Sequence, residues 1–93
     1  MAETTFRLRD DALEWREVEQ QIVALDLKTS RYLALNRSGR LLWQLLAAGA
    51  TMDGLAGALA DVYGLDPERA RADVEALIAQ LEDEDLILRE EPG

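Results

Sequence analysis

Apolar and polar residues alternate along the first third of the chain, and this two-residue period predicts short β-strands. The alternation is clearest after residue 20, where Val23, Leu25 and Leu27 share one face and residues 22, 24 and 26 share the other. The pattern predicts strands over four segments: Thr4–Arg9, Leu13–Val18, Gln20–Leu27 and Arg31–Leu35.

The last two of these segments are separated by a polar loop, residues 28–30, which predicts a β-hairpin. A three-residue loop would place Leu25 opposite Leu33 and Val23 opposite Leu35. All four side chains would then lie on one face, so that the hydrophobic pattern and the register agree. Such loops usually end in a left-handed residue, for which glycine is preferred, whereas the last loop residue here is a serine.

From residue 36 onward the apolar residues recur at helical spacing. Asn36, Thr51 and Asp66 are suitable N-caps, because their side-chain oxygens can accept from free N–H groups of the first turn. Gly49 and Gly64 are suitable helix stops. The sequence therefore predicts helices over Arg37–Ala48, Met52–Tyr63 and 67–82, with residues 86–88 as either a short final strand or an extended tail.

Strands followed by helices indicate an α+β fold with a helix-turn-helix-like or winged-helix half. Ninety-three residues, of which 48% are hydrophobic, are enough for one domain with one modest core. Trp43 is expected in this core, together with Val74, Ile78 and Leu81 of the third helix.

Composition removes most catalytic chemistry. The chain has no cysteine and no histidine, so the usual nucleophile–base pairs and thiolate metal sites are absent. Its only lysine, Lys28, falls in a loop that we expect to be exposed. We therefore predict a protein that is not an enzyme and needs no cofactor. No apolar run approaches the ~20 residues of a membrane span, and the first residues lack signal-peptide character, so we expect a soluble cytoplasmic protein.

The net charge of −9 lies entirely in the second half of the chain. Residues 1–50 hold seven acids and seven bases, whereas residues 51–93 hold twelve acids and three bases. An acidic third helix would be repelled by DNA, because DNA affinity comes largely from cations that neutralise phosphates. The acidic half either favours cationic partners or forms a solvated face that aids solubility.

A short sheet without catalytic residues can still bind an extended peptide, which adds as a further strand to an open sheet edge. We expect Arg31–Leu35 to be that edge. Three alternatives remain open: this strand only closes the core, the edge pairs with a partner protein as a structural subunit, or the helical half is a winged-helix DNA-binding unit.

Several ordered motifs bear on this choice. They are Leu25-Asp26-Leu27, Arg31-Tyr32-Leu33-Ala34-Leu35-Asn36-Arg37-Ser38-Gly39, Leu42-Trp43, Leu46, Asp73-Val74, Leu77, Leu81 and Asp85-Leu86-Ile87. Together they make residues 13–88 resemble the PqqD-like family, the recognition elements that bind precursors of ribosomally made, modified peptides (RiPPs). Ser30 stands where the family usually has glycine in the hairpin loop, and Asp85 stands where glycine often precedes the final leucine.

The resemblance implies one domain over residues 1–93 with its core at about 13–88. It implies a three-stranded antiparallel sheet followed by a three-helix, winged helix-turn-helix-like half. A precursor's leader peptide would add as a fourth strand, in a groove against the third helix. The residues implied to bind it are Arg31, Tyr32, Leu33, Ala34, Leu35, Asp73, Ala76, Leu77 and Gln80.

A stand-alone chain of this kind most resembles the recognition protein of lasso-peptide biosynthesis. Such a protein works with a cysteine-protease leader peptidase. The close alternative is the pyrroloquinoline quinone (PQQ) pathway protein, which partners a radical-SAM enzyme. The resemblance also gives the acidic third helix a role, because its acids could pair with Lys or Arg of the leader.

Overall fold

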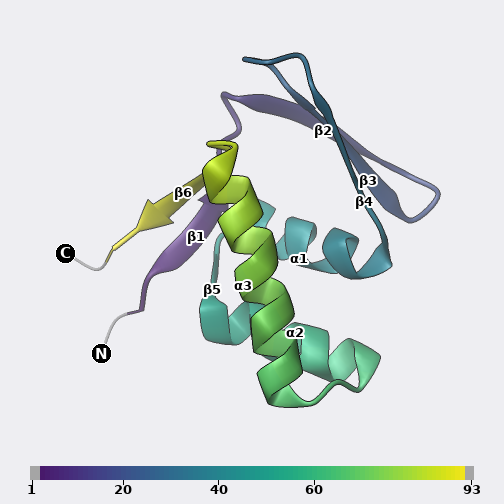
Figure 1. Cartoon of the computed structure of the whole chain (residues 1–93), viewed down its shortest axis with the longest axis vertical. Coiled ribbons are helices and arrows are strands. Elements are labelled where there is room, and N and C mark those ends of the chain that lie inside the picture. Colours follow the sequence, from purple (N-terminus) through teal and green to yellow (C-terminus); the bar gives the residue numbers. More distant parts are fainter. Residues whose placement is uncertain (1–2, 92–93) are drawn as a thin grey trace.

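The computed structural model describes residues 3–91, which form two three-stranded antiparallel sheets and three helices (Figure 1). The first sheet has the order β2 (Leu13–Val18), β3 (Gln21–Asp26), β4 (Tyr32–Leu35). The second has the order β5 (Ala50–Thr51), β1 (Thr5–Leu8), β6 (Ile87–Glu90). The helices are α1 (Arg37–Ala48), α2 (Met52–Tyr63) and α3 (Pro67–Asp83).

The predicted α+β class, the main three-stranded sheet and the three helices are confirmed. The bounds of α1 and α2 are those expected, because their caps are local. The Asn36 side chain accepts from the Gly39 N–H at 3.2 Å, and the Thr51 hydroxyl accepts from the Gly54 N–H at 3.1 Å. Gly64 ends α2 in the left-handed conformation, with φ 63°. Asp66 precedes α3 but makes no side-chain capping bond.

The register predicted for the β3–β4 hairpin is wrong by one residue. Ala24 lies opposite Leu33 and Ile22 opposite Leu35. The Asp26 N–H donates to the Arg31 carbonyl at 2.8 Å, so the connecting loop has four residues, 27–30. The inward face of β3 therefore carries Ile22 and Ala24, and the set that contains Val23 faces outward.

Asp26 explains the error, because a carboxylate is expected to face water and this one is only 9% exposed. Its side chain accepts from the backbone N–H of Lys28 at 2.9 Å, so the tight turn satisfies it locally. The last loop residue, Ser30, does adopt the left-handed conformation, with φ 60°.

The predicted N-terminal strand exists as β1, but it pairs outside the main sheet. Thr5 lies opposite both Thr51 of β5 and Glu90 of β6. Residues 87–90 therefore form a strand, so the segment predicted as either a short final strand or an extended tail is a strand. This small second sheet joins the two ends of the described chain beside the helices (Figure 1).

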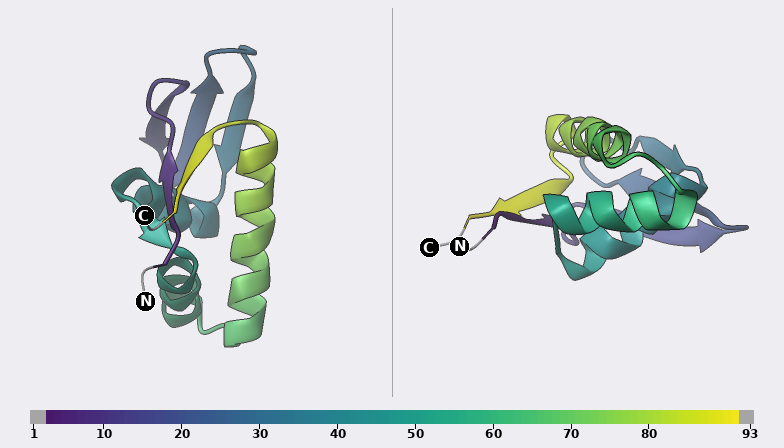
Figure 2. Two further views of the ribbon diagram at one scale, coloured as in Figure 1. Left: turned by 90° about the vertical axis from the view of Figure 1, so that its left-hand side faces the viewer. Right: turned by 90° about the horizontal axis from the view of Figure 1, so that it is seen from below.

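One hydrophobic core joins both sheets and all three helices. The helices lie on one face of the β2–β3–β4 sheet and leave its other face without a helical cover (Figure 2). Trp43 of α1 is fully buried, and its ring meets that of Trp15 edge to face, with centroids 6.0 Å apart. Val74, Ile78 and Leu81 of α3 are buried as predicted. Phe6 and Leu8 bring β1 into the same core.

Candidate peptide-binding edge and groove

β4 is an edge strand, because it pairs with β3 on one side and with no strand of residues 3–91 on the other. Along an antiparallel strand, successive residues turn their N–H and C=O groups to alternate sides. Arg31 bonds to β3 through its carbonyl, so Leu33 and Leu35 also bond to β3. Tyr32 and Ala34 therefore direct their N–H and C=O groups to the open edge. These four groups are a template for a further strand.

A groove of about 590 Å³ lies beside the end of β4. One wall comes from Leu35 and the first turn of α1, and the opposite wall comes from Asp73 and Leu77 of α3. In the left view of Figure 2, α3 stands on the same side of the molecule as β4. The groove is lined by Leu35, Asn36, Arg37, Ser38, Gly39, Leu42, Leu59, Tyr63, Leu65, Asp73 and Leu77.

The nine residues predicted to bind a peptide divide into three groups. Leu35, Asp73 and Leu77 meet in the groove. The other four strand residues are at the edge: Arg31, Tyr32 and Ala34 are exposed, and Leu33 is half-buried on the inward face. Ala76 and Gln80 are exposed on α3 but do not line the groove.

Sequence reasoning did not find the floor of the groove, which α1, α2 and the following turn supply. Leu42 and Leu59 look like ordinary core residues, and Tyr63 and Leu65 flank a helix stop. Only Tyr63 stands out from ordinary core residues, because it is a large aromatic side chain that is 41% exposed in the structure. These residues converge because α2 and α3 are joined by only three residues, 64–66, as in a helix-turn-helix.

The corner between β4 and α1 fixes the near wall of the groove. Asn36 ends the strand and caps the helix, and its side chain also accepts from the Ser38 hydroxyl at 3.0 Å. Gly39 lies directly against the strand, since a Cβ placed there would be 2.8 Å from the Leu35 Cβ. A side chain at residue 39 would thus push Leu35 out of its place.

An ion-pair cluster holds the tip of the β3–β4 hairpin to the second sheet. Asp85 receives both Lys28 from the hairpin loop and Arg9 from the end of β1, the latter at 2.9 Å. The hydrogen bond from Lys28, and then that from Arg9, lowers the pKa of the Asp85 carboxyl below its usual value of 3.8. Asp85 itself is left-handed, with φ 59°, at the turn from α3 to β6.

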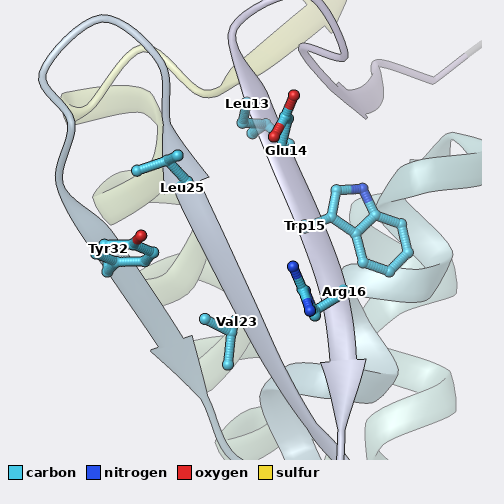
Figure 3. Close-up of a pocket in the computed structure, with 7 residues that line it drawn as sticks. All are labelled: Leu13, Glu14, Trp15, Arg16, Val23, Leu25 and Tyr32. Atoms are coloured by element: carbon cyan, nitrogen blue, oxygen red, sulfur yellow. The ribbon is translucent and has the colours of Figure 1, made fainter.

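The outer face of the β2–β3–β4 sheet carries a second hollow, of about 470 Å³ (Figure 3). Val23, Leu25 and Tyr32 project from it side by side, with Glu14 and Arg16 on β2 next to them (Figure 3). Tyr32 is 75% exposed, so this face offers apolar surface to solvent beside the open edge.

Within residues 3–91, no group of three or more His, Cys, Asp or Glu side chains is placed to hold a metal ion. Searching the same residues finds no helix with the length and apolar character needed to cross a membrane.

The fold and the groove define a small α+β domain with a helix-turn-helix-like half and an open sheet edge. The chain belongs to the PqqD family: the family described as coenzyme PQQ synthesis protein D matches residues 21–87. No curated protein matches the chain in sequence.

Two solved structures share the fold. One is described as "Lasso peptide synthetase B1 complexed with the leader peptide", with 28% identity, a TM-score of 0.78, and coverage of 89% of this chain and 96% of that one. The other is "TbiB1 in Complex with the TbiA(beta) Leader Peptide", with 23% identity, a TM-score of 0.80, and coverage of 87% and 93%.

Proposed function

We propose that this protein is a non-catalytic adaptor that binds the leader peptide of a ribosomally made precursor. The leader adds as a fourth strand along β4, and the adaptor presents the precursor to a leader peptidase of the cysteine-protease type or to another modifying enzyme. The observation that carries the proposal is the open edge at Tyr32 and Ala34, beside an apolar groove. We propose that the whole chain acts as one such domain, in the cytoplasm.

Lasso-peptide biosynthesis is the favoured setting, because both structural neighbours are described as complexes with leader peptides and one is named a lasso peptide synthetase B1. The family description favours a second candidate, a chaperone of the precursor of pyrroloquinoline quinone. Both candidates use the same edge and differ in the peptide that binds.

The groove is needed as well as the edge. Four backbone hydrogen bonds at the edge contribute ~2–6 kcal/mol in total, at ~0.5–1.5 kcal/mol each. Ordering the peptide takes back ~2–5 kcal/mol. Micromolar affinity needs about 8 kcal/mol, so even the strongest hydrogen bonding and the smallest ordering cost leave about 4 kcal/mol to be supplied, which requires at least two apolar side chains buried at ~1.5–3 kcal/mol each. Leu35 and Leu77 are placed to receive them. Arg31, Leu33, Asp73, Ala76 and Gln80 complete the proposed binding residues.

The test is a titration by fluorescence anisotropy with the labelled leader of the precursor encoded beside this protein's gene. Ala34→Pro removes an outward N–H and leaves every β3–β4 bond in place. We expect it to weaken binding at least tenfold, while Ala34→Val, which keeps the N–H, binds within about threefold of the wild type. Leu33→Pro is unsuitable, because the Leu33 N–H serves the bond to Ala24.

Equal affinity of a folded Ala34→Pro variant and the wild type would refute pairing at this edge. The same titration with the precursor peptide of pyrroloquinoline quinone separates the two candidates, since only one of the peptides should bind tightly.

A further inference from the structure

The Lys and Arg side chains of this acidic chain differ in whether they have a carboxylate partner. Six of the ten Lys and Arg side chains form ion pairs with carboxylates: Arg7, Arg9, Lys28, Arg40, Arg71 and Arg89. The other four have no carboxylate partner within residues 3–91: Arg16, Arg31, Arg37 and Arg69.

Two of these four arginines bracket the open edge. Arg31 comes directly before β4, and Arg37 follows it at the first position of α1. Both are exposed, and Arg37 lines the groove. By strand alternation Arg31 lies on the same face as Leu33 and Leu35, which is the groove side. The edge strand therefore lies between two positive charges that the protein does not neutralise, although its net charge is −9.

Two of the five acids of α3 form ion pairs within the protein. Glu75 pairs with Arg71 at 3.5 Å, and Glu82 pairs with Arg89 at 3.1 Å. Of the α3 acids, Asp73 alone lines the groove. The charge that a peptide on β4 meets is thus set by two arginines and one aspartate, and it is opposite in sign to the charge of the chain as a whole.

We propose that the peptide recognised at this edge is acidic, with an Asp or Glu near each end of the segment that pairs with β4. This inference rests on the proposed function and names the chemistry of its ligand. Arg31 and Arg37 are six positions apart, and at about 3.3 Å per residue a peptide strand needs its acids roughly six positions apart to face both. A cationic leader, which the acidic sequence of α3 first suggested, would meet these two arginines and be disfavoured.

A different role for the same arginines is protection of the edge. Unpaired charges beside an open strand discourage pairing between copies of a protein. That role predicts self-association when the charges are removed, and it predicts no preference for acidic peptides. The two roles can therefore be told apart by a selection experiment, in which only the recognition role enriches acidic peptides.

The experiment is an mRNA-display selection of random twelve-residue peptides on the immobilised full-length protein. We expect the enriched peptides to carry more Asp and Glu than Lys and Arg, with acids recurring about six positions apart. The best peptide is then synthesised, labelled and titrated by anisotropy. Replacing both arginines, Arg31→Gln with Arg37→Gln, should weaken its binding about 3- to 10-fold, since each exposed ion pair contributes little.

Two controls test whether the loss of affinity comes from contacts between these arginines and the acids of the peptide. Arg71→Gln removes one positive charge by the same type of substitution on the side of α3 away from the groove, and it should leave affinity within about twofold. A peptide whose acids are changed to Gln should bind the wild type as weakly as the acidic peptide binds the double variant, and the double variant should not distinguish the two peptides.

Enriched peptides without an acidic excess, or an acidic peptide that binds the double variant as well as the wild type, would overturn the proposal. Self-association of the double variant with unchanged peptide affinity would assign the arginines to edge protection instead. If enriched peptides also bind Ala34→Pro fully, the edge itself is not the site, and the proposed function fails separately from the charge preference.

Discussion

Gly39 offers a sharp test of how β4 and α1 are joined, because the expected sign of its effect is unusual. Alanine in place of a helical glycine normally stabilises a protein by up to ~1 kcal/mol. At Gly39, however, the new Cβ would lie 2.8 Å from the Leu35 Cβ, and neither atom can move without its backbone. Overpacking of this kind costs ~1–3 kcal/mol. We therefore expect Gly39→Ala to destabilise the protein by about 1 kcal/mol.

Gly57 provides the matched control within the same chain. It lies in the middle of α2, and a Cβ built there meets nothing within 4 Å. Gly57→Ala should therefore give the ordinary gain of ~0.5–1 kcal/mol. One chemical change thus has opposite expected signs at two helical positions, and the difference comes only from the contact with Leu35.

Thermal melts followed by circular dichroism measure both variants. For a domain of this size 1 kcal/mol shifts the Tm by about 4–8 °C, so Gly39→Ala should melt several degrees below the wild type and Gly57→Ala a few degrees above it. A Gly39→Ala variant that gains stability as Gly57→Ala does would show that the β4–α1 corner is looser than described. Such a corner could not hold Leu35 as a wall of the groove.

Two further changes test the hairpin and its anchor. Ser30→Gly relieves a left-handed serine, with φ 60°, so we expect a Tm unchanged or raised by the equivalent of up to ~1 kcal/mol; a clear drop in the melt would contradict this conformation. Asp85→Asn keeps a residue that tolerates φ 59° but removes the carboxylate that Lys28 and Arg9 hold. The pKa of Asp85 is lowered in the folded state, so its stabilisation is present above the ordinary value of 3.8 and is lost as the pH falls through the lowered pKa. The Tm of Asp85→Asn should therefore lie below that of the wild type at neutral pH, and the two should converge as the pH falls below 3.8 and through the lowered pKa; a constant difference would refute the linkage.

Helix bounds could be predicted from the sequence because caps act within a few residues. Asn36, Thr51 and Gly64 each determine a boundary through bonds or dihedral angles that involve only their neighbours. The strand before α1 could be predicted for a similar reason, since a short apolar run directly before an N-cap is a local pattern. Both kinds of signal depend only on residues that are neighbours in the sequence.

Register and sheet membership could not be predicted, because they depend on distant partners. Each face of β3 carries two apolar residues and one polar one, Gln21 or Asp26, so the burial of the Asp26 carboxylate reverses the choice of face. β1 has a clear alternating pattern, yet the residues of β6 that pair with it come 79 to 85 positions later, from Leu8 with Ile87 to Thr5 with Glu90. The floor of the groove is likewise assembled from three segments that each look like ordinary core.

The two edges of the main sheet are not equivalent, and this asymmetry is the strongest reason to assign binding to β4. On β2, alternation directs the N–H and C=O groups of Leu13, Trp15 and Glu17 outward, because the intervening residues bond to β3. That edge is tied to α1: the Glu17 carboxylate accepts from Arg40 and from Gln44, each at 2.7 Å, and Trp15 packs on Trp43.

A strand added beside β2 would meet side chains already engaged with the helix, and the hollow of about 470 Å³ next to β2 carries the charged side chains of Glu14 and Arg16. At the end of β4, the larger groove of about 590 Å³ lies between the strand and α3 and is lined by five leucines and Tyr63. Both edges offer backbone hydrogen bonds, but the β4 edge adds the larger apolar groove in which a peptide can bury the side chains that it needs for useful affinity. The arginines before and after β4 then add a preference of charge at this edge.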